Sequence, residues 1–145
     1  MAMTREIDLF AYDTDPDTAR RIADEIDGSL GQASQFDDTY GYYCDGVEPR
    51  TAILPVDWNL RAKEYSNENT DGVTAIVPSP NDIAVSKLCA GRTKDIDWLV
   101  AAVRHRMIDP DAIKSLFNRL PTDRPGIRID ALEENLAVVL SRARS

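Results

Sequence analysis

The chain has 145 residues, of which 43% are hydrophobic and 29% charged, a composition that excludes a disordered or fibrous protein and fits one globular domain over residues 1–145. Residues 1–80 hold 16 acidic and 6 basic residues, and residues 81–145 hold 9 acidic and 11 basic residues. The net charge of −8 therefore comes from the first part, and such an acidic surface disfavours bulk nucleic-acid binding. No apolar run reaches the roughly 18 residues of a membrane span, and the two cysteines lack the spacing of a zinc site or disulfide framework, so we expect a cytoplasmic protein with no membrane partner.

The first predicted elements are a strand and a helix. Residues 6–12 form a β-compatible run that ends in the polar segment 13–15. Pro16 suits the first position of a helix, and apolar residues recur at helical spacing from there to residue 26. Gly28 is able to close this helix in a left-handed conformation.

The middle of the chain, residues 29–69, mixes glycines, aspartates and aromatics without a sustained period. Residues 41–44 and 51–54 are compatible with short strands, separated by a turn at Asp45-Gly46 and the loop that follows. We expect the strand over 6–12 to lie beside the strand over 51–54.

Beyond a further predicted strand at 73–77, the pattern becomes helical. Helices are predicted to begin at Pro80, after Thr93 as an N-cap, at Pro110 and at Asp130, where Asp130 and Glu133 have the spacing of a capping box. The expected fold class is α/β (α+β), with a small mixed sheet in residues 1–78 and a helical layer in residues 79–145.

The first candidate for chemistry is the pair Glu6 and Asp8. On a strand, the two-residue period places both carboxylates on one face, with Ile7 on the other. Two carboxylates placed in this way can hold Mg²⁺ on a phosphate-bearing substrate. The alternative is an acidic pair that merely lines the solvent face of a strand in an acidic chain.

The second candidate is the segment from Pro80 to Asp95. Lys87 shares a helix face with small and apolar residues, so its half-buried stem can present the ammonium to a phosphate. Arg92 and Lys94 lie near the donor-rich start of the next helix, which also favours anions. The alternative is that Lys87 only covers apolar surface and that Lys94-Asp95 is an ordinary exposed helix start.

Taken together, the two candidates resemble a known family. Thr4-Arg5-Glu6-Ile7-Asp8-Leu9-Phe10 is similar to the T-R-D-I-D strand of nucleotidyltransferase-like proteins, and the segment from Pro80 to Asp95 is similar to their P-x-D…S-K-L…G-R-x-K-D element. The pairing resembles bacterial nucleotidyltransferase-like proteins near the AbiEii abortive-infection toxins. The resemblance covers roughly residues 4–120.

The resemblance implies that Glu6 and Asp8 bind Mg²⁺ and the phosphates of a nucleoside triphosphate. It further implies that Lys87 contacts phosphate, with Lys94 and Asp95 in support. Glu6 stands where the family usually has Asp, and the strand expected at 51–54 carries no third carboxylate. Only five residues precede Glu6, so we expect the family's upstream helix with its Gly-Ser turn to be absent.

Three functions remain open from the sequence. The favoured one is a truncated or degenerate nucleotidyltransferase-like protein that binds a protein partner or its own copy, in a toxin–antitoxin or phage-defence setting. The first alternative is an active Mg²⁺-dependent nucleotidyltransferase that transfers a nucleoside monophosphate. The second is an acidic inhibitor whose N-terminal part imitates nucleic acid.

Overall fold

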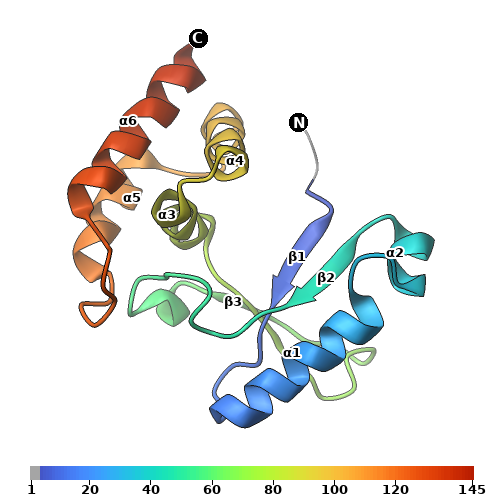
Figure 1. Cartoon of the computed structure of the whole chain (residues 1–145). Coiled ribbons are helices and arrows are strands. Elements are labelled where there is room, and N and C mark those ends of the chain that lie inside the picture. Colours follow the sequence, from blue (N-terminus) through green and yellow to red (C-terminus); the bar gives the residue numbers. More distant parts are fainter. Residues whose placement is uncertain (1–3) are drawn as a thin grey trace. The chain divides into compact units, whose positions relative to one another are not determined.

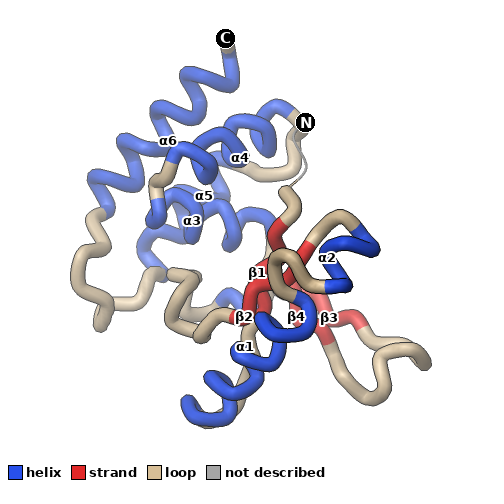
Figure 2. Tube along the Cα trace, turned by 45° about the vertical axis from the view of Figure 1, so that its right-hand side comes forward, coloured by secondary structure: helices blue, strands red, loops and turns tan. Residues whose placement is uncertain are grey.

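The computed structural model describes residues 4–145 and has the mixed α+β class expected from the sequence (Figure 1). The chain divides into two compact units, Met1–Ala52 and Ile53–Ser145, and each is described by itself. Figure 2 shows that strands are short and that helices dominate the chain after residue 79. Among the described residues, no helix combines the length and the apolar character needed to cross a membrane.

The first unit is built around two parallel strands. Strand β1 (Glu6–Leu9) pairs with β2 (Tyr43–Gly46), and helices α1 (Pro16–Leu30) and α2 (Gln35–Tyr40) lie between them in the chain. Parallel strands need a connection of a dozen residues or more, which these helices provide.

The expected pairing of the first strand with residues 51–54 is wrong, because 51–54 form no strand and residues 43–46 take that place. The turn expected at Asp45-Gly46 is also wrong, since both residues belong to β2. Helix α1 does begin at Pro16 as predicted, with Asp15 accepting a hydrogen bond from the backbone N–H of Thr18 at 2.9 Å. It continues through Gly28 to Leu30 instead of closing there.

Residues 53–145 contain a two-stranded antiparallel sheet and a helical bundle. After the 3₁₀ turn η1 (Trp58–Leu60), strand β3 (Lys63–Tyr65) pairs with β4 (Ala75–Val77). The bundle comprises α3 (Pro80–Ala90), α4 (Thr93–Arg104), α5 (Pro110–Leu116), the 3₁₀ turn η2 (Phe117–Arg119) and α6 (Ile129–Arg144).

The helices of this bundle form the main hydrophobic core, which includes Val85, Leu88, Leu99, Ile113, Leu136 and Val139. Two helices start at the predicted residues, Pro80 and Pro110, whereas Thr93 is the first residue of α4 and not its cap, because Arg92 occupies the N-cap position without a side-chain hydrogen bond. The fourth starts one residue early, at Ile129, and Asp130 forms an ion pair with Arg128 in place of the expected capping box.

Candidate functional site

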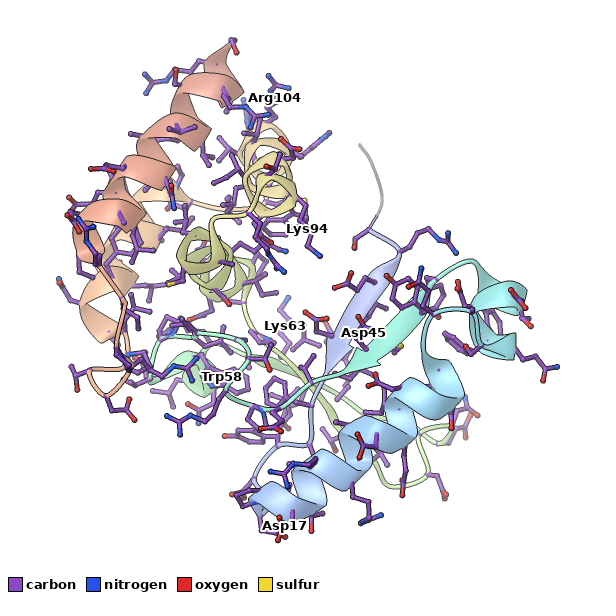
Figure 3. The ribbon with its side chains drawn as sticks, viewed as in Figure 1. Asp17, Asp45, Trp58, Lys63, Lys94 and Arg104 are labelled. Atoms are coloured by element: carbon purple, nitrogen blue, oxygen red, sulfur yellow. The ribbon has the colours of Figure 1, made fainter. Side chains whose placement is uncertain are left out.

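Three carboxylates meet on one face of the β1–β2 pair. Glu6 and Asp8 share this face as the two-residue period requires, and the register places Tyr43 beside Glu6 and Asp45 beside Asp8. Ligand oxygens of Glu6, Asp8 and Asp45 all lie within 4.8 Å of one another. Figure 3 labels Asp45 on β2. The strand pair therefore assembles a cluster of oxygen ligands of the kind that divalent cations bind.

Helix α1 packs against the opposite side of β2 and fixes its position. A Cβ atom on Gly46 would lie 2.0 Å from the backbone oxygen of Ala23, so only glycine permits this close approach. The backbone N–H of Gly46 donates to Asp27 Oδ1 at 2.6 Å. Ala23 of α1 and Cys44 of β2 are both buried. These contacts hold the strand that carries Asp45.

Tyr43 borders the carboxylates on the same face. Its hydroxyl lies 3.5 Å from Glu6 Oε2, at the long limit of a hydrogen bond. Burial and the negative charges of Glu6 and Asp45 raise the pKa of the Tyr43 phenol. A cation bound between the carboxylates would relieve this concentration of negative charge.

Arg5, the basic residue before the acidic pair, has a structural role. Its Nη2 lies 2.8 Å from Asp37 Oδ1, and its Nε donates to the backbone oxygen of Gly41 at 2.9 Å. The other oxygen of Asp37 accepts from the N–H of Ala33 at 3.0 Å. Arg5 thus ties the start of β1 to helix α2.

In residues 53–145, the structure brings together three of the residues predicted between Pro80 and Asp95. Asp95 Oδ1 lies 3.4 Å from Lys87 Nζ, and Asp95 Oδ2 lies 2.7 Å from Arg92 Nε. The Asp95 side chain is 1% exposed, whereas Lys87 is 29% exposed and its ammonium lies 5.2 Å from the centre of the Trp98 ring. A buried carboxylate therefore holds two cations at the junction of α3 and α4.

The charge state of Asp95 follows from these neighbours. Burial acts to raise its pKa, but the hydrogen bond from Arg92 and the positive charge of Lys87 outweigh burial and leave the pKa below its usual range. Lys94 is exposed on the first turn of α4 (Figure 3), and the contacts described for Asp95 come from Lys87 and Arg92. The acidic and the cationic clusters belong to different compact units.

Sequence reasoning missed Asp45, the third carboxylate. Asp-Gly is among the sequences favoured in tight turns, so Asp45-Gly46 was predicted as a turn. Tyr43 and Asp45 in fact flank the buried Cys44 with strand periodicity. The alternation of residues 43–46 was the signal available, but the parallel partner of β1 lies far along the chain and local patterns do not identify it.

Comparison with protein families places most of the chain in a known family. The family described as "Nucleotidyltransferase of unknown function (DUF6036)" matches residues 1–134. Searches of the curated proteins and of the solved structures returned no match. The family match spans both compact units and includes the acidic and the cationic clusters.

Proposed function

Because the chain belongs to a family of nucleotidyltransferases of unknown function, we propose that it binds a nucleoside triphosphate with a divalent cation and transfers the nucleoside monophosphate to an acceptor, with release of pyrophosphate. Glu6, Asp8 and Asp45 would hold the cation. The observation that carries this proposal is Asp45, which adds a third carboxylate to the pair visible in the sequence.

The three carboxylates fit Mg²⁺ chemically. Mg²⁺ prefers oxygen ligands, and it commonly takes a few carboxylates together with substrate phosphates. Glu6 is one methylene longer than the aspartate usual in the resembling proteins, and its carboxylate still falls within the cluster. When bound, the cation would neutralise negative charge on the phosphate oxygens.

A separate proposal, which follows the resemblance, is that Lys87 and Arg92 of the second compact unit contact phosphate. Both are held by Asp95, so each cation is positioned before a ligand arrives and loses less side-chain entropy on binding. Asp95 is itself buried, which favours a positioning role over direct contact with a nucleotide. Lys94 is exposed on the same helix turn and adds a further positive charge.

The degenerate binding module is the main competing function. That interpretation rested on the expected absence of the upstream Gly-Ser turn and, in part, on the lack of a third carboxylate on the expected strand, and Asp45 supplies the carboxylate. We therefore favour transfer over a purely binding role. A toxin–antitoxin or phage-defence setting and a cytoplasmic location remain predictions, as does imitation of nucleic acid by the acidic first part.

Association with a second copy is a separate part of the proposal. Ile7 is 44% and Leu9 37% exposed, and both side chains belong to the face of β1 opposite the carboxylates. Apolar side chains left this exposed on a strand favour burial against another chain. Light scattering at micromolar concentration should give the mass of a dimer, and a strictly monomeric particle would reject this association.

Transfer is tested by incubating the protein with each α-³²P-labelled nucleoside triphosphate, Mg²⁺ and a cell extract that supplies acceptors. We expect label in acid-precipitable material, reduced by at least about a hundredfold in Asp8→Asn, because metal ions contribute several kcal/mol of charge stabilisation in such reactions. Asp38→Asn is the matched control, since Asp38 is an exposed acid on α2 outside the carboxylate cluster. Nucleotide binding without transfer would support the binding module instead.

A further inference from the structure

A cavity of about 290 Å³ lies within residues 53–145, and its lining contains none of Lys87, Arg92, Lys94 and Asp95. One lining residue follows η1, one lies in the first turn of α3, and the others belong to α5 and η2. The lining comprises Arg61, Asn81, Ala112, Ser115, Leu116 and Arg119. Two guanidinium groups therefore share one small cavity.

Buried and half-buried acids hold both arginines in place. Arg61 donates from Nε and Nη2 to the two carboxylate oxygens of Asp82, at 3.0 and 2.7 Å, and Asp82 is fully buried. The same Nη2 lies 3.0 Å from Asp57 Oδ1, and Asp57 also pairs with Arg119 Nη1. The forked contact with Asp82 thus fixes the guanidinium plane of Arg61, and one contact with Asp57 anchors Arg119 beside it.

The remaining polar groups of the lining are mostly donors. Within residues 4–145, the hydrogen bonds of the two arginines to Asp57 and Asp82 leave Arg61 Nη1 and the Nε and Nη2 of Arg119 as donors for a ligand. Asn81 uses its carbonyl oxygen to accept from the N–H of Asp109 at 2.9 Å, which leaves its amide N–H groups. Ser115 donates its hydroxyl proton to the backbone oxygen of Ala112.

We propose that this cavity binds a small molecule carrying a carboxylate or phosphate group, through Arg61, Arg119 and Asn81. The volume is at the lower end for ligand pockets, so it suits a small metabolite better than a nucleoside triphosphate. Asp57 and Asp82 balance the charge of the two arginines, so recognition depends on the geometry of fixed N–H donors more than on net charge. Leu116 and Ala112 provide the apolar part of the lining.

The test uses the full chain, with inorganic phosphate and acetate titrated separately at constant ionic strength. Side-chain Nε–H signals of Arg61 and Arg119 are followed by NMR. We expect saturable shifts with at least one of the two anions, at millimolar concentrations. Saturation with phosphate alone would indicate a ligand that carries a phosphate group. Saturation with both anions would indicate that the cavity recognises the anionic oxygens that carboxylates and phosphates share.

Three variants make the result specific. Arg119→Ala should weaken binding by about tenfold or more, as expected for the loss of a charged, forked donor. Arg119→Lys keeps the charge beside Asp57 without the planar fork and should weaken binding less. Arg128→Ala removes another arginine of an exposed ion pair and should leave binding unchanged.

Phosphate bound at the cationic cluster of Lys87 and Arg92 is a separate event. Lys87→Ala should therefore leave the titration of the Arg61 and Arg119 signals unaltered. Shifts that never saturate with either anion, or equal binding by the parent protein and Arg119→Ala, would overturn the proposal.

Discussion

The buried acids of the described chain each hold an arginine. Asp37 is paired with Arg5, Asp82 with Arg61 and Asp95 with Arg92. A buried carboxylate is costly unless it is paired and hydrogen-bonded, so each pair also fixes the position of its arginine. The carboxylates proposed to bind metal are instead half-buried or exposed, as a group that must meet a ligand requires.

Asp95 provides a direct test of this role. Asp95→Asn removes the charge that faces Lys87 and Arg92 and should lower the free energy of unfolding by about 1.5–3 kcal/mol, the range for hydrogen bonds to charged groups. Asp97→Asn is the control, because Asp97 forms an exposed pair with Arg142 worth at most about 1 kcal/mol. Equal losses in urea unfolding would contradict the assignment.

Asp57 makes stability depend on pH in a defined window. The hydrogen bond from Arg61 lowers the pKa of Asp57 to about 2, against an ordinary value of 3.8. Since the folded-state pKa is depressed, the stabilisation is complete above pH of about 4 and is lost as the pH falls toward 2. The difference in Tm between the parent protein and Asp57→Asn should therefore shrink across this window, and a constant difference down to pH 2.5 would refute it.

At the scale of elements, the helices after residue 79 and the strand that begins at Glu6 were predictable, whereas the strand that pairs with it was not. Pro80 and Pro110 mark helix starts through local chemistry, and apolar residues repeat over several turns. Strands β1 and β2 have four residues each and pair across two intervening helices. Such short strands carry little period, and parallel pairing depends on distant contacts, so Glu6 and Asp8 were found from sequence while Asp45 was not.

Two glycines of the first unit should respond oppositely to alanine. Gly46→Ala places a Cβ against the backbone of Ala23 and should destabilise the α1–β2 contact by about 1–3 kcal/mol or more. Gly28→Ala meets no atom within 4 Å, lies inside α1 and should stabilise the protein by about 0.5–1 kcal/mol. Urea unfolding of both variants checks this, and a neutral Gly46→Ala would mean that the two backbones do not approach this closely.

At the scale of the whole molecule, the two units differ in their capacity to bury apolar surface. The buried hydrophobic residues of positions 4–52 are Ala19, Ala23 and Cys44, all small, whereas the large core belongs to residues 53–145. We expect a fragment of residues 53–145 to unfold cooperatively by itself, and a fragment of residues 1–52 to lack a cooperative transition. Thermal unfolding of the two fragments, followed by circular dichroism, tests this. A cooperative transition in residues 1–52 and none in residues 53–145 would contradict the prediction.

If Glu6, Asp8 and Asp45 form one divalent cation site, the full chain should bind Mn²⁺, and calorimetric titration measures this binding. We expect saturable binding that Asp45→Asn weakens by at least about tenfold, because affinity depends on the number of charged ligands. Asp38→Asn should leave the affinity unchanged. Equal Mn²⁺ affinity in the parent protein and Asp45→Asn, or no saturable binding to the parent protein, would contradict the proposed cation site.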